Sequence, residues 1–141
     1  MNATSHLRGS IALVASFLAM GLVLEALLGL RWSAWLDDEL RRELLRLGHA
    51  HGGLLAILNV GVAWALERLR TPAAWARRVR AASLAGAALV GLGFIGGGLW
   101  HGPTDPGPLV LVVPAGALLL LCSLVAIAVV RPPPIADEPD P

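Results

Sequence analysis

The chain has 141 residues, of which 56% are hydrophobic and only 15% charged, and its formal net charge at pH 7 is +1. This composition is too apolar for an ordinary soluble domain of this size. It predicts a protein that lies in a lipid bilayer.

Four uninterrupted apolar stretches match the roughly 20 residues that a helix needs to cross about 30 Å of hydrocarbon. They cover residues 11–30, 47–66, 81–100 and 109–130. The first is longer than the apolar core of a secretory signal and has no convincing cleavage site after it, so we expect it to be retained. Short connections make neighbouring spans antiparallel. The pattern predicts an all-α membrane protein, an antiparallel four-transmembrane-helix bundle that forms one domain over residues 1–131.

A short amphipathic outer segment separates the first two spans. Leucines 36, 40, 44 and 47 recur at helical spacing and charged residues fill the other faces, with Asp37 as the predicted N-cap. Trp32 and Trp35 precede it and suit a headgroup boundary. The segment either lies along the membrane or extends the second span outward.

The end of the chain contains two proline features. Pro114 lies near the start of the fourth span, where it removes one backbone hydrogen bond and can kink the helix. Residues 132–141 are mostly proline and acidic residues, which predicts a disordered cytoplasmic tail.

The distribution of arginine predicts the orientation, because all eleven basic residues are arginine. The connection between the second and third spans contains five of them: Arg68, Arg70, Arg77, Arg78 and Arg80. Counting Arg8 and Arg131, this side has seven arginines and the other side has four, so the positive-inside rule places both termini in the cytoplasm. We expect a multi-pass protein of a bacterial inner membrane. The arginine cluster has the size of a positive-inside loop, so we expect no nucleic-acid partner.

Three ionisable residues fall in the same outer third of the predicted bundle. Glu25 is the only charged residue in the first span, His49 lies at the start of the second, and His101 follows the third. An ionisable group inside a span is costly, usually faces the bundle interior and marks a functional site.

Residues four apart share a helix face, and each of these three residues has glycine in its row. The rows are Gly21, Glu25 and Gly29; His49 and Gly53; and Gly93, Gly97 and His101. Because small residues allow membrane helices to approach closely, we expect the rows at helix contacts, where Glu25, His49 and His101 could converge. Asn59 in the second span is expected to form an interhelical hydrogen bond.

Imidazole and carboxylate together are good ligands for zinc, copper or iron. The predicted metal site consists of Glu25, His49 and His101, with His51 and Asp105 as further candidate ligands. His49 and His51 can both point inward only if the backbone departs from a helix, because two residues turn the side chain by about 200°. A b-type haem with His49 and His101 as axial ligands is a second form of the hypothesis. Cys122 is the only cysteine, which excludes a c-type attachment.

Two other functions remain open. The chain could be a metal-free scaffold or accessory subunit with a membrane protein partner or a second copy, or a proton-coupled small transporter in which Glu25 titrates. No recognisable catalytic motif is present, so we expect that the chain is not an enzyme by itself.

The segment Leu47-Gly-His-Ala-His-Gly-Gly-Leu-Leu, together with Glu25 and the segment from Asp105 to Ala117, resembles a family of small uncharacterised bacterial four-span integral membrane proteins. The resemblance implies the four-helix architecture and no particular activity. The preferred hypothesis is therefore a membrane protein that binds a transition metal or haem near its periplasmic face, within a redox or metal-handling system.

Overall fold

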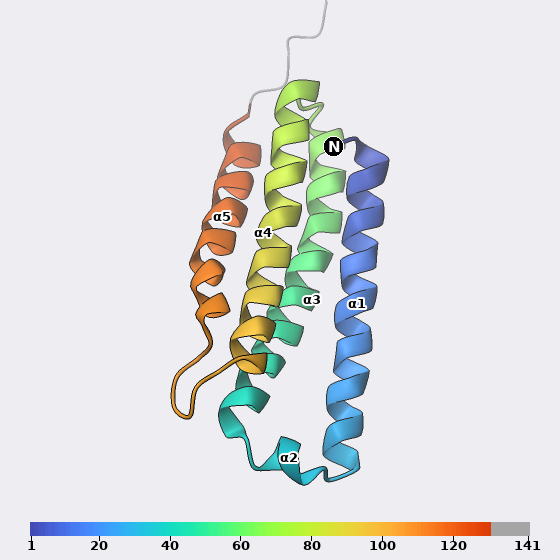
Figure 1. Ribbon diagram of the computed structural model, residues 1–141. Coiled ribbons are helices and arrows are strands. Elements are labelled where there is room, and N and C mark those ends of the chain that lie inside the picture. Colours follow the sequence, from blue (N-terminus) through green and yellow to red (C-terminus); the bar gives the residue numbers. More distant parts are fainter. Residues whose placement is uncertain (131–141) are drawn as a thin grey trace, which may run out of the picture.

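The computed structural model describes residues 1–130, which form a helical bundle without any strand (Figure 1). The long helices are α1 (Ala3–Gly29), α3 (Glu39–Arg68), α4 (Ala73–Leu99) and α5 (Val112–Val129). A short helix, α2 (Ser33–Leu36), and a 3-10 helix, η1 (Pro108–Leu111), lie in two connections at one end. The predicted all-α four-helix bundle is confirmed.

The helices pack as a curved layer in which α4 contacts α3 on one side and α5 on the other, while α1 packs mainly on α3. The α3–α4 turn, the N-terminus and the end of α5 lie together at the top of Figure 1. We call this the arginine end, because its turn contains Arg68 and Arg70. The opposite end, with α2 and residues 100–107, is called the loop end.

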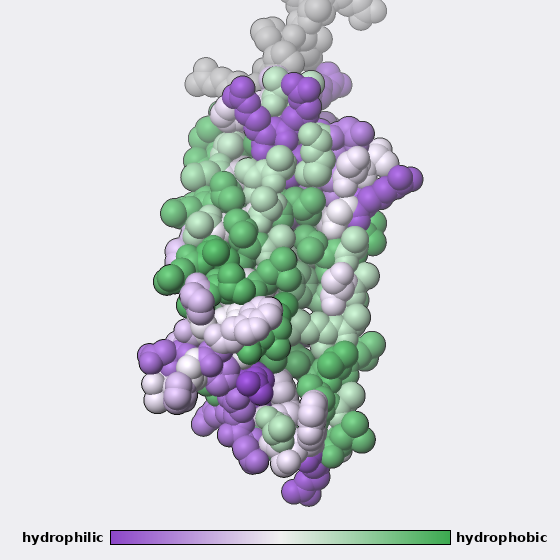
Figure 2. Space-filling model, in the orientation of Figure 1, coloured by the Kyte–Doolittle hydropathy of each residue, from purple (hydrophilic) through white to green (hydrophobic). Residues whose placement is uncertain are grey.

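The surface between the two ends is apolar. In Figure 2 hydrophilic residues gather at both ends and hydrophobic residues cover the middle. Large apolar side chains such as Leu22 and Leu121 are more than half exposed there. All four long helices are long and apolar enough to cross a membrane, α5 together with η1. The chain is therefore a multi-pass membrane protein whose exposed apolar faces contact lipid.

Three helices begin earlier than the apolar pattern predicts: α1, α3, and α4, which starts at Ala73. Helix α1 starts at Ala3, because the Asn2 side chain accepts a hydrogen bond from the Ser5 N–H at 2.7 Å and caps it. Helix α3 is continuous from Glu39, so the amphipathic outer segment extends the second span outward. Asp38 caps it by accepting from the Arg41 N–H at 3.0 Å.

The predicted cap at Asp37 is wrong. The backbone N–H of Asp37 donates to the Ser33 carbonyl at 2.9 Å, so this residue closes α2 and is not free to start α3. Helix α2 thus lies between the end of α1 and the residues Asp37 and Asp38.

Pro114 is the third residue of α5. Helix N–H groups in the first turn have no intrahelical acceptor one turn earlier, so the missing N–H of proline removes no helix-interior bond. The chain before it adopts the tighter 3-10 geometry of η1. The predicted disordered tail, residues 132–141, lies outside the described residues.

Helices α1 and α3 end in the same way. The residue after each C-cap is an arginine with positive φ, 51° at Arg31 and 49° at Arg70. The N–H of each arginine donates back three residues, and the N–H of the next residue donates back five. These are Schellman motifs, in which glycine is the usual residue at this left-handed position.

Candidate functional site

A pocket of about 740 Å³ lies between α1 and α3 toward the loop end. Leucines from both helices form its apolar wall. Its polar lining consists of Glu25, Trp35, Arg42, Glu43, Arg46 and His49. Because α1 and α3 are antiparallel, the charged residues of the first turns of α3 lie near the end of α1, and His49 lies further along α3 toward the middle of the bundle.

His49 is held in one tautomer. Its Nδ1 lies 2.7 Å from the carbonyl oxygen of Phe17 on α1, and a carbonyl oxygen can only accept, so Nδ1 carries the hydrogen. In the neutral ring Nε2 then keeps its lone pair. Gly21 makes room for this ring, because a Cβ at that position would lie 2.5 Å from Cε1 of His49.

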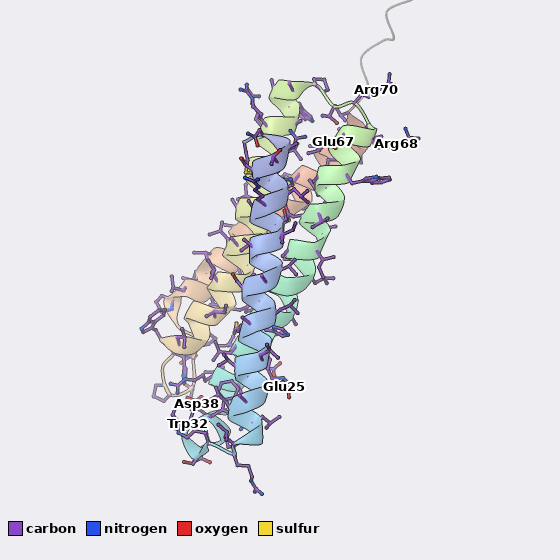
Figure 3. The ribbon with its side chains drawn as sticks, turned by 90° about the vertical axis from the view of Figure 1, so that its right-hand side faces the viewer. Glu25, Trp32, Asp38, Glu67, Arg68 and Arg70 are labelled. Carbon is purple, nitrogen blue, oxygen red and sulfur yellow. The ribbon has the colours of Figure 1, made fainter. Side chains whose placement is uncertain are left out.

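Glu25 shares this pocket, although its side chain is exposed. Figure 3 shows it on α1 near the same end as Asp38 and Trp32, and far from Arg68 and Arg70. The Arg42 guanidinium on the facing wall donates to the Leu36 carbonyl and so ties α3 to α2. The carboxylate of Glu25 therefore lies in a pocket that also contains positive charge.

His101 lies in a different place. Its Nε2 donates to the Asp38 carboxylate at 2.9 Å, and its Nδ1 faces the Gly102 carbonyl oxygen. Both ring nitrogens are therefore engaged. A second pocket, about 810 Å³, contains His101 and Asp38 together with Asp37, Glu39 and Glu43.

Asp38 is the centre of this loop-end contact. It accepts hydrogen bonds from the Arg41 backbone N–H and from His101, and it forms an ion pair with the Arg41 guanidinium at 3.3 Å. The Arg41 N–H and these two further partners hold the pKa of the Asp38 carboxyl below its usual value, although partial burial acts in the opposite direction. The contact joins the start of α3 to the segment that follows α4.

The other two candidate ligands point elsewhere. His51 is exposed, its Nδ1 lies 3.0 Å from the Leu47 carbonyl oxygen, and its ring packs against Phe94 with centroids 5.4 Å apart. Asp105 is exposed in a turn, where it accepts from the Thr104 hydroxyl at 2.9 Å.

The five candidate metal ligands are thus distributed over separate places. Of the five, the structure brings only Glu25 and His49 to one pocket. Within residues 1–130, no three His, Cys, Asp or Glu side chains lie close enough to hold one metal ion. The haem pairing of His49 with His101 would also require one ring nitrogen of His101 to leave its present partner, either Asp38 or the Gly102 carbonyl.

The glycine rows separate in the same way. Gly21 faces His49 on α3, whereas Gly93 and Gly97 face residues 109–113 of η1 and α5. A Cβ at Gly53 would make one ordinary contact, with the Cβ of Phe17 at 3.8 Å, and a Cβ at Gly29 would meet nothing within 4 Å in the described part of the chain. The row of His101 therefore does not direct that residue toward Glu25.

A second polar group was missed by sequence reasoning. Asn59 does form interhelical hydrogen bonds, but one of its partners is His6, which is fully buried on α1. Sequence reasoning gave His6 no role because it precedes the first apolar stretch. The signal that could have found it is the Asn2 cap, which allows α1 to include the polar residues before residue 11.

Fold and site define a multi-pass four-helix membrane protein with a polar pocket between α1 and α3. Comparison with known proteins finds no matching family model, no matching curated protein and no matching solved structure. A function has to be inferred from the geometry of the pocket.

Proposed function

We propose that the protein binds a lipid-soluble molecule with a hydroxyl-bearing head group, such as a quinol, in the pocket between α1 and α3. The observation that carries this proposal is the free lone pair on Nε2 of His49, which follows from the hydrogen bond between Nδ1 and the Phe17 carbonyl. A lone pair of this kind accepts a hydrogen bond from a hydroxyl group.

The rest of the pocket supports an amphipathic ligand. Its leucines suit an apolar tail that enters from the lipid, and its charged residues lie at the end where headgroups are expected. Glu25 is the proton acceptor in this proposal, because it is an ionisable group within the same pocket. In this step Glu25 takes the proton of the bound hydroxyl group and leaves its oxygen as an anion, so the step needs no oxidant.

A transition metal is a second candidate, because the same Nε2 lone pair is the one that a metal ion would use. Glu25 is the only other candidate ligand in this pocket from the predicted set. Further ligands would have to come from water or from a second copy of the chain.

The test compares His49→Ala with His51→Ala in lipid nanodiscs. The second variant is a matched control, because His51 belongs to the same helix and lies outside the pocket. We expect His49→Ala to weaken binding of a short-chain benzoquinol about fivefold, the value of one hydrogen bond of about 1 kcal/mol, and His51→Ala to leave it unchanged.

Elemental analysis of the same samples for iron, copper and zinc separates the two candidates. Stoichiometric metal that is lost in His49→Ala and kept in His51→Ala would favour the metal site. Equal quinol binding in both variants, with no metal, would overturn both candidates and leave a scaffold or accessory subunit as the explanation.

A further inference from the structure

The half of the bundle nearer the arginine end contains a buried polar cluster from three helices. Four of its members are at most 3% exposed, and the fifth, an arginine, is 9% exposed. They are His6 and Ser10 of α1, Asn59 of α3, and Arg80 and Ser83 of α4. So many buried polar groups inside a membrane bundle are costly unless they are paired or functional.

Hydrogen bonds fix the state of the histidine. The Asn59 amide nitrogen donates to the carbonyl oxygens of Leu55 at 3.0 Å and Ser83 at 3.3 Å, so its amide oxygen faces Nε2 of His6 at 3.0 Å. That oxygen can only accept, so Nε2 carries the hydrogen. In the neutral ring Nδ1 therefore has a lone pair.

This lone pair has no partner among the described residues, although it is completely buried. The Arg80 Nε–H is also buried and unpartnered within residues 1–130. Arg80 on α4 is the charged member of the cluster, whereas α1 and α3 contribute the uncharged Ser10 and Asn59. The cluster thus contains a nitrogen, Nδ1 of His6, that can accept a proton. The positive charge of Arg80 in the same cluster opposes permanent binding of that proton.

The ring of Phe17 separates this cluster from the pocket of Glu25 and His49. Phe17 is 3% exposed and fills the space that the missing side chains of Gly52 and Gly91 leave between α3 and α4. Its carbonyl oxygen accepts from His49. Residues 6, 10, 17, 21 and 25 follow one face of α1, so the ring lies between the two polar regions along the membrane normal.

We propose that His6 is a proton-binding site of a path along α1, and that the Phe17 ring closes this path toward Glu25 and His49. Protons reach Nδ1 of His6 from the arginine end and pass the ring only when it moves. The proton site at His6 does not depend on the proposed ligand. The other end of the path, at Glu25 and His49, rests on the proposed function of the pocket.

The experiment measures proton flux in proteoliposomes that contain a pH-sensitive dye. Phe17→Ala should pass protons about tenfold faster than wild type, which corresponds to a barrier lower by about 1.4 kcal/mol. Phe94→Ala is the matched control, since Phe94 packs on the exposed His51, and it should behave like wild type. Equal flux in Phe17→Ala and Phe94→Ala would overturn the proposal.

The double variant His6→Gln/Phe17→Ala tests the histidine itself. Glutamine can still donate toward Asn59 but cannot titrate, so the flux should return to near the wild-type rate. A leak that persists in the double variant would show that protons do not use His6. These outcomes do not depend on quinol binding, so a failure here is distinct from a failure of the proposed ligand.

Nitrogen NMR on the unmutated protein provides a measurement that no folding defect can affect. We expect His6 to show a hydrogen on Nε2 at neutral pH and reversible protonation of Nδ1 as the pH is lowered. A ring whose nitrogen shifts do not change with pH would exclude His6 as a proton site.

Discussion

The two polar regions of the α1–α3 contact differ in how their hydrogen bonds are arranged. In the pocket near the loop end, His49 uses one nitrogen to hold its position, and its other nitrogen has no hydrogen-bond partner among residues 1–130. In the buried cluster, Asn59 is fully engaged and His6 faces other buried groups. The first arrangement suits binding of an external ligand, whereas the second couples the polar groups to the stability of the fold.

The largest expected effect is in the buried cluster. Asn59→Ala removes the partner of His6 and the bond to Ser83, leaving buried polar groups unpaired, so we expect it to reduce the free energy of unfolding by about 3 kcal/mol. Unfolding in detergent followed by circular dichroism measures this change. His49→Ala serves as the comparison and should cost clearly less. Similar losses in both variants would remove the distinction between the two regions.

The next largest effect is expected where the Phe17 ring packs against α3, between the two polar regions. A Cβ at Gly52 would collide with the Phe17 ring, so Gly52→Ala should destabilise the bundle by about 2 kcal/mol through overpacking. Gly61→Ala is the control on the same helix, where no atom of the described chain lies within 4 Å of the new carbon. It should be neutral or stabilise α3 by up to about 1 kcal/mol. Thermal unfolding of both variants measures the difference.

The smallest effect concerns the loop end and depends on pH. Because its hydrogen-bond donors lower the pKa of Asp38 in the folded state, the carboxylate stabilises the fold above its ordinary pKa of about 3.9, and this contribution is lost as the pH falls through the lower folded value. Asp38→Ala should cost about 1 kcal/mol near neutral pH, as expected for a lost N-cap.

Unfolding midpoints of wild type and Asp38→Ala should therefore converge as the pH is lowered below about 4. A constant difference between the two proteins over the whole pH range would mean that the Asp38 charge does not contribute. The comparison then shows whether the loop-end contact is electrostatic or depends only on shape.

The sequence predicted the four spans because their signal is local: about 20 apolar residues are enough to identify each. Whether Glu25, His49 and His101 converge could not be predicted in this way, because it depends on which neighbouring helix each helix face contacts. Helix α4 presents Gly93 and Gly97 to η1 and α5, while His101 meets Asp38 at the start of α3. Periodicity identifies residues that share a face but not the neighbour of that face.

His6 could not be placed by composition, since residues 3–10 contain no apolar run. It is fully buried against Asn59, which is 53 positions away and itself bonds to Ser83 of α4. The tautomer of His49 depends on a backbone carbonyl of another helix in the same way. Such contacts exist only after the helices have packed.

The two left-handed arginines also limit how far the bundle can slide along the membrane normal. Arg31 and Arg70 directly follow the last turns of two antiparallel helices, at opposite ends of the bundle. Moving the pair along the membrane normal in either direction would draw one guanidinium into hydrocarbon, at a cost of about 3 kcal/mol near the centre. Glycine would relax both turns but would not resist this sliding. The two arginines therefore favour a bilayer whose hydrocarbon thickness matches the distance between them.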